Sequence, residues 1–164
     1  MRNPDIIRNF VFGVEDSLVS TVGLISGVAA AGSSRSAILL AGIILVFVEA
    51  FSMAAGSLLS DNSADELVQK SSISIFRSMS GAIVMFLSYF ISGFVVLAPY
   101  MILPPQTALS VSIVISLLAL FALGAFSAKL IGNSVFKKAF TMAIVGGSAI
   151  ILGIVVGNFV EKML

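Results

Sequence analysis

Four side chains in the first third of the sequence have types that rarely lie within apolar stretches unless they serve a function. They are the carboxylates of Glu15, Asp16 and Glu49 and the thioether of Met53. An acidic residue near the centre of a membrane-spanning helix costs about 2.5–3.5 kcal/mol unless it faces a partner, an ion or water. Carboxylates bind hard divalent cations, and an added thioether shifts the preference towards softer metals such as ferrous iron. The four residues therefore point to a site for a divalent metal ion. Carboxylates removed from water can also exchange such an ion for protons.

Helical spacing predicts how these side chains meet. Glu49 and Met53 are four residues apart and therefore share one face of a helix. At about 1.5 Å per residue, Asp16 and Met53 each lie about 9 Å from the same membrane surface, and Glu49 lies about 15 Å from it. We expect Asp16 to oppose Met53, with Glu49 one turn deeper. Glu15 is turned roughly 100° from Asp16, so it serves a second ion position, faces another subunit or lies among lipid headgroups.

Other interpretations of the same residues remain open. Glu15 or Asp16 could be an interfacial cap, because the dipole of a helix favours anions near its N-terminus. Glu49 could belong to a structural salt bridge, although the apolar stretches contain no Lys or Arg to pair with it. Met53 alone could fill a hydrophobic core. The proximity expected among the four residues is what favours a metal path.

The elements that must position these residues are membrane-spanning helices. The chain has 164 residues, of which 59% are hydrophobic and 10% charged, with a mean hydropathy of +1.14. A soluble domain is roughly 45–50% apolar and about 25% charged. Apolar runs of about 22–25 residues can cross a hydrocarbon core as helices. We predict one all-α transmembrane domain over residues 1–164, with helices at about 10–31, 37–59, 78–102, 107–128 and 139–160.

The basic residues predict how these helices are oriented. Seven of the nine Lys and Arg residues fall on the side of the N-terminus, if the five stretches cross in turn. Positive charge is enriched on the cytosolic side of membrane proteins, so we expect a cytosolic N-terminus and an external C-terminus. The sequence before the first stretch has no small-residue cleavage site, so we interpret it as a cytosolic lead-in and not as a signal peptide.

Two pairs of glycines have the spacing that lets helix backbones approach closely. Gly23 and Gly27 lie four residues apart, as do Gly153 and Gly157. They indicate either packing within one subunit or an interface between identical subunits.

The missing residue types exclude several functions. The chain contains no His and no Cys, which removes the usual proton shuttle and the thiolate ligand. A membrane serine protease needs a His, a zinc protease needs HExxH, and an aspartyl protease needs a second intramembrane Asp beside Asp16. We therefore expect no enzyme and no cofactor other than a transported ion. The net charge of +1 gives no reason to expect nucleic acid. The acidic residues after the second stretch are expected to be solvated in a loop: Asp61, Asp65 and Glu66.

Three segments resemble the vacuolar iron transporter family. Residues 13–21, GVEDSLVST, resemble its first-helix signature G-x-N-D-G-L-V-S-T, and residues 52–56, SMAAG, resemble the S-M-A-x-G of its second helix. Residues 93–100 are similar to the G-x-x-x-L-x-P-Y ending of its third helix. The resemblance implies five helices, a homodimer, and proton-coupled export of ferrous iron, sometimes manganese, from the cytosol. By position, Asp16 and Met53 match family residues on the ion path.

The sequence also departs from the family pattern. Glu15 replaces the Asn before the Asp, and Ser57 replaces the Glu that normally follows S-M-A-x-G, while Glu49 lies four residues before Met53. The connection after the second stretch is too short to contain the Glu-rich metal-binding domain found in many relatives. We expect metal ligands at Asp16, Glu49, Met53 and Glu15, and a prokaryotic plasma membrane or a vacuolar or other organelle membrane. The alternative is a protein of the same fold that is a membrane scaffold, a subunit or a carrier of another solute.

Overall fold

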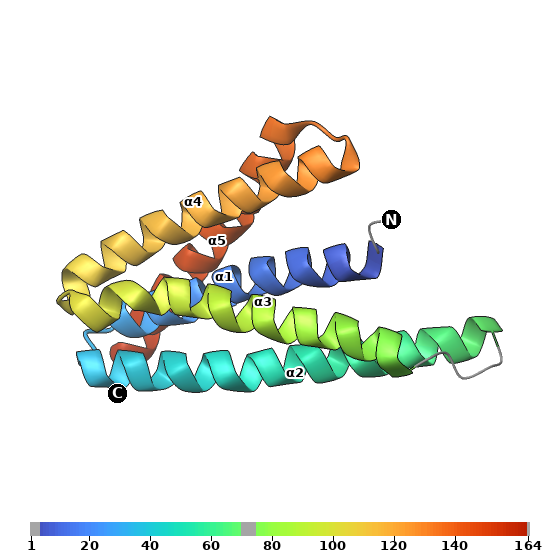
Figure 1. Cartoon of the computed structure of the whole chain (residues 1–164). Helices are drawn as coiled ribbons and strands as arrows, with labels where there is room; N and C mark the ends of the chain where they lie inside the picture. Colours follow the sequence, from blue (N-terminus) through green and yellow to red (C-terminus); the bar gives the residue numbers. More distant parts are fainter. Residues whose placement is uncertain (1–3, 70–74, 164) are drawn as a thin grey trace.

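The computed structural model describes residues 4–69 and 75–163, and all regular structure within them is helical. The five helices are α1 (Pro4–Ala30), α2 (Arg35–Gln69), α3 (Ile75–Ile102), α4 (Pro105–Ile131) and α5 (Val135–Glu161) (Figure 1). Each contains a stretch long and apolar enough to cross a membrane, which confirms the prediction of an all-α chain with five such helices. Arg2 and Lys70 are two of the seven basic residues on which the predicted orientation depends, and they lie outside the described residues.

The helix boundaries differ most from the expectation after position 59. α2 continues to Gln69 instead of ending near residue 59, and α3 begins at Ile75. Residues 64–69, ADELVQ, are mainly good helix formers, so the polar segment extends the helix beyond the apolar stretch. Asp61, expected in a solvated loop, therefore lies on α2. α3 ends at Ile102 and Pro104 directly precedes the first residue of α4, because proline cannot continue a helix from the preceding turn.

The helices run alternately up and down, and α1 lies at the centre of the packing. The N-terminus and the α4–α5 connection lie at one end of the molecule, and the C-terminus lies at the other (Figure 1). α1 contacts all four other helices, whereas α2 packs mainly against α3. α1 and α5 run parallel, since both start at the end that holds the N-terminus. Which end faces the cytosol stays a prediction from charge.

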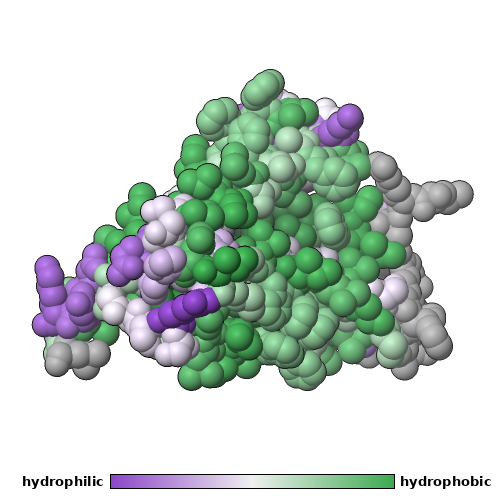
Figure 2. Space-filling view, turned by 60° about the vertical axis from the view of Figure 1, so that its left-hand side comes forward, coloured by the Kyte–Doolittle hydropathy of each residue, from purple (hydrophilic) through white to green (hydrophobic). Residues whose placement is uncertain are grey.

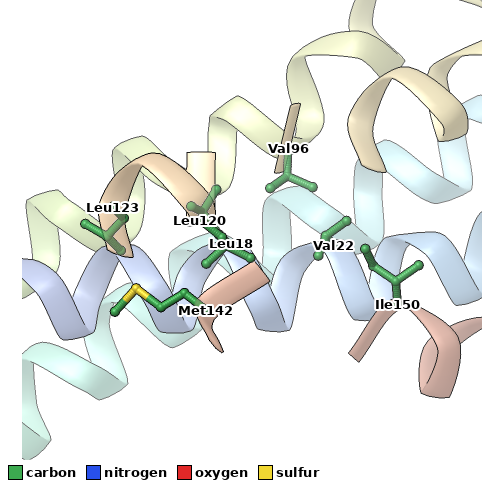
Figure 3. Close-up of a cluster of buried hydrophobic side chains, with 7 residues drawn as sticks. All are labelled: Leu18, Val22, Val96, Leu120, Leu123, Met142 and Ile150. Carbon is green, nitrogen blue, oxygen red and sulfur yellow. The ribbon is translucent and has the colours of Figure 1, made fainter. Parts of the chain in front are cut away.

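Two clusters of buried apolar side chains surround α1. The first joins α1, α3, α4 and α5 (Figure 3) and comprises Leu18, Val22, Val96, Leu120, Leu123, Met142 and Ile150. The second joins α1, α2, α3 and α4 and comprises Ile25, Ile38, Val46, Leu97, Tyr100 and Ala108. Large hydrophobic side chains also cover the exterior, and Figure 2 shows them over most of one face. An apolar surface of this extent fits lipid as the surrounding solvent.

The glycine pairs predicted from spacing pack against each other within this chain. A Cβ atom on Gly153 would collide with the carbonyl oxygen of Gly23, and one on Gly157 would collide with that of Gly27. No side chain other than hydrogen fits between these backbones. Of the two interpretations of the glycine spacing, the structure shows packing within one subunit, which fixes α1 against α5 in the half away from the N-terminus.

Replacing Gly153 by Ala tests this contact. We expect Gly153→Ala to lower the free energy of unfolding by about 1–3 kcal/mol, because an overpacked interface must shift its backbones apart. Gly147→Ala is the matched control on the same helix, since a Cβ atom there meets nothing within 4 Å. Melting temperatures in detergent should fall for Gly153→Ala and not for Gly147→Ala. Equal melting temperatures would contradict the close approach of α1 and α5.

Candidate functional site

A cavity of about 1060 Å³ lies at the end of the molecule that holds the N-terminus. Its walls come from the N-terminal half of α1, the C-terminal half of α2, Met85 of α3, the end of α4 and the start of α5. The charged residues that line it are Arg8, Glu15, Asp61 and Lys138. The cavity thus contains two carboxylates and two cationic groups in otherwise apolar and hydroxyl-bearing walls.

Two of the four predicted ligands line this cavity. They are Glu15 on α1 and Met53 on α2. Asp16 is not among the lining residues, so of the predicted carboxylate ligands it is Glu15 that shares the cavity with Met53, whereas helical depth alone suggested Asp16. Depth along a helix does not fix the rotation of that helix about its axis, and the structure supplies this rotation.

The other two predicted ligands come together on the α1–α2 face. Asp16 and Glu49 are both half-buried, and their negative charges lie close enough to repel each other. Both charges also act on Tyr89 of α3, whose side chain is fully buried. The hydroxyl groups of Tyr89 and Ser20 are 2.7 Å apart and share a hydrogen bond. Ser17 donates a hydrogen bond of 2.6 Å to the carbonyl oxygen of Tyr89. Tyr89 therefore holds α1 in register beside the carboxylate pair.

Polar contacts join α1 to α2 at the rim of the cavity. Arg8 donates a hydrogen bond of 2.8 Å to the carboxylate of Asp61 and forms a salt bridge with it. Ser57 lies one turn before Asp61 on α2, and its hydroxyl accepts a hydrogen bond of 3.0 Å from the Asn9 amide. Asn9 is only 1% exposed. A Cβ atom on Gly81 of α3 would lie 2.6 Å from the Asn9 amide nitrogen. Three helices thus meet tightly at Asn9.

Sequence reasoning missed most of this rim. Asn9 and Arg8 precede the expected first helix, so neither was considered as a packing residue. Ser57 stands where the family pattern has a Glu, and its hydroxyl accepts a hydrogen bond from the Asn9 amide. Asn9 lies four residues before Gly13 and therefore on the same face of α1. This spacing would have indicated a buried Asn9, but only if the helix had been expected to begin at Pro4.

A second cavity of about 640 Å³ adjoins the first. It is lined by Glu15 and by residues from the α4–α5 connection and the start of α5: Asn133, Ser134, Lys137, Lys138, Thr141 and Met142. Glu15 and Lys138 line both cavities. Among the side chains that the structure describes, those of residues 4–63 and 78–163, no three acidic, His or Cys groups lie together so that they could hold a metal ion.

Five apolar helices around acidic residues and a charged cavity define a multi-pass membrane protein with a polar site inside its spanning region. The sequence model of the VIT family matches residues 7–74 and 69–158, and the chain belongs to this family. The chain is also 24% identical to Vacuolar iron transporter 1 of Arabidopsis thaliana over 205 aligned residues, which cover 88% of this chain and 82% of the plant protein. The alignment is longer than the 164 residues of this chain, so the plant protein contains residues with no counterpart here.

The lack of native cysteine offers a direct test of the first cavity. We expect Met53→Cys to react with a charged, membrane-impermeant thiol reagent added from the side of the N-terminus, because Met53 lines the cavity. Ala50→Cys is the control on the same helix, since Ala50 is fully buried. The measurement is the labelling rate in sealed vesicles of known orientation. Equal labelling of the two variants, or labelling of Met53→Cys only from the opposite side, would contradict an aqueous cavity at this end.

Proposed function

We propose that this protein is a transporter, and not an enzyme, which exports ferrous iron or manganese from the cytosol in exchange for protons. The observation that carries the proposal is a cavity lined by Glu15 and Met53 between spanning helices that also hold Asp16 and Glu49, two carboxylates near enough for their charges to interact. Membership in the VIT family and the similarity to a plant vacuolar iron transporter support metal ions as the substrate class.

The chemistry of the ligands supports a divalent transition metal. Two repelling carboxylates in a medium of low dielectric are stabilised by one divalent cation, which neutralises both charges. The thioether of Met53 adds a soft ligand, which favours ferrous iron over magnesium or calcium. In this proposal Glu15 and Met53 receive the ion in the cavity, and Asp16 and Glu49 bind it on the next step of the path.

Proton coupling follows from the same charge balance. When the metal ion leaves, the carboxylate pair again carries two unneutralised negative charges, and protons are the other cations that can neutralise them. Ion and protons therefore compete for the same two groups. Such a pair couples outward movement of a metal ion to inward movement of protons without a histidine.

The surface around the pair supports a homodimer. Asp16 and Glu49 are each partly exposed in a single chain, and a carboxylate that faces lipid is costly. The neighbouring side chains of Val48 and Phe51 are 58% and 70% exposed. A second copy that covers this face of α1 and α2 would remove the carboxylates from lipid and bring acidic residues of two subunits together.

Transport into proteoliposomes tests the function. With an acidic lumen and ferrous iron or manganese outside, the wild type should accumulate metal, because outward proton movement drives inward metal movement through molecules whose cytosolic side faces the medium. Asp16→Asn and Glu49→Gln should each reduce uptake to the background of protein-free liposomes. Removing the pH gradient should reduce the uptake by the wild type.

Glu161→Gln is the matched control for the loss of one negative charge. Glu161 is exposed at the far end of α5, away from both cavities, so its uptake should equal that of the wild type. No uptake of either metal by folded wild-type protein would reject the proposal and favour a scaffold or a carrier of another solute. Full activity of Asp16→Asn and Glu49→Gln would reject the assigned path.

A further inference from the structure

A salt bridge crosses the mouth of the first cavity. Arg8 on α1 and Asp61 on α2 both line this cavity, and Nη2 of the guanidinium lies 2.8 Å from Oδ1 of the carboxylate. Glu15 follows Arg8 on α1, and Met53 precedes Asp61 on α2, in each case by about two helical turns. An ion that comes from the side of the N-terminus therefore passes the salt bridge before it reaches Glu15 or Met53.

Asp61 begins a row of oxygen- and sulfur-bearing side chains along the cavity wall. Asp61, Ser57 and Met53 are spaced four residues apart on α2, and all three line the cavity. Residues at this spacing share one face of a helix, and each step of four residues leads about 6 Å further inwards. A cation that binds Asp61 thus has its next ligands on the same wall, in the direction of Met53.

The arginine of this salt bridge can leave more easily than the aspartate. The side chain of Arg8 is 60% exposed and that of Asp61 is 21% exposed, so a released guanidinium returns to water. Its other contacts are weak, because Nε and Nη2 donate to Oδ1 of Asn9 at 3.4 and 3.5 Å. An ion pair with so exposed a partner is also weak in water. A divalent cation, which carries twice the charge, can therefore replace the guanidinium at Asp61.

The helices around the salt bridge are fixed, so the exchange does not require them to move. The buried Asn9 of α1 donates a hydrogen bond of 3.0 Å to Ser57 of α2. A Cβ atom on Gly81 of α3 would lie 2.6 Å from Nδ2 of Asn9 and 3.6 Å from Oδ2 of Asp61. The carboxylate of Asp61 thus lies against the backbone of α3 and keeps its place when Arg8 leaves. The moving part is the side chain of Arg8.

From this geometry we infer that the Arg8–Asp61 salt bridge is a cation-operated gate: Asp61 is the entry ligand of the cavity, and the guanidinium of Arg8 occupies it until an entering divalent cation takes its place. The inference rests on the proposed transport function and adds an entry site to it. A monovalent metal ion carries no more charge than the guanidinium and replaces a charge-assisted hydrogen bond, so it gains nothing from the exchange. The gate therefore favours divalent ions.

Labelling of a cysteine inside the cavity tests the gate without any metal. In the Met53→Cys protein, a trimethylammonium methanethiosulfonate reagent should react at least about three-fold faster when Arg8→Gln is added, because the freed carboxylate of Asp61 attracts the cationic reagent. In an Asp61→Asn background most of this acceleration should disappear. Equal acceleration in both backgrounds would show plain repulsion by Arg8 and would overturn the gate.

Lys129→Gln is the matched control for the loss of one positive charge. Lys129 is exposed near the end of α4, at the same end of the molecule as Arg8, and lines neither cavity. Its substitution should leave the labelling rate of Met53→Cys within about 1.5-fold, because solvent screens a charge at that distance. An acceleration as large as that of Arg8→Gln would also overturn the gate.

Binding of Mn²⁺ to the purified protein in detergent separates a failure of the gate from a failure of the proposed function. The wild type should bind Mn²⁺, and Arg8→Gln should bind it at least about three-fold more tightly, since no guanidinium competes for Asp61. If the wild type binds Mn²⁺ and Arg8→Gln changes neither affinity nor labelling, the gate is overturned and the transport function stands. If the wild type binds no Mn²⁺ while Arg8→Gln still accelerates labelling through Asp61, the transport function is overturned and the gate stands for another cation.

Discussion

The cost of holding negative charge inside a membrane is the constraint on which the rest of this structure depends. Glu15, Asp16 and Glu49 all lie within spanning helices, and each must be neutralised, solvated or covered. Their surroundings differ. Glu15 lines a cavity that also contains the cationic Lys138, whereas Asp16 and Glu49, on the packed helices α1 and α2, are near enough for their like charges to interact. Like charges on neighbouring helices are unfavourable until a cation binds, and for this reason the proposed transport function assigns the divalent ion to this position.

The packing of α1 divides the molecule into a closed half and an open half. Towards the C-terminal end of α1, glycines at 23 and 27 bring its backbone against α5 with no room for a side chain. Towards the N-terminal end the helices surround a cavity of about 1060 Å³, and polar contacts such as Arg8–Asp61 replace the glycine packing. Glu15 lines the cavity of the open half, and Asp16 follows it on α1, next to the residues that hydrogen-bond to Tyr89. An ion that enters from the open end therefore meets the acidic residues before the tightly packed region.

Hydropathy and spacing were sufficient to predict the five helices and the closely packed glycine pairs, because each of these is a property of one segment or of a repeated spacing. They were not sufficient to predict contacts that depend on how one helix is rotated against another. This is why Glu15, and not Asp16, shares the cavity with Met53. It is also why the contacts of Asn9, Tyr89 and Lys138 were not predicted. Asn9 precedes the expected first helix, Tyr89 lies in an apolar stretch, and Lys138 is one of several basic residues in a connection. None of the three belongs to a local pattern that would single it out. The continuation of α2 past residue 59 was missed because hydropathy reports the end of the apolar stretch and not the end of the helix.

The central claim is that Asp16 and Glu49 bind the transported ion together, and the position of a bound metal tests it most directly. Crystals or oriented particles of the protein loaded with Mn²⁺ would locate the ion by its anomalous scattering or its density. The account predicts a peak at about 2.0–2.6 Å from carboxylate oxygens of both residues. This range covers the metal–oxygen distances of divalent cations in proteins. Substitution of Asp16 by Asn should remove this peak. A metal ion bound only at surface acids such as Asp61 or Glu161, with the Asp16–Glu49 pair unoccupied in fully loaded protein, would contradict the account.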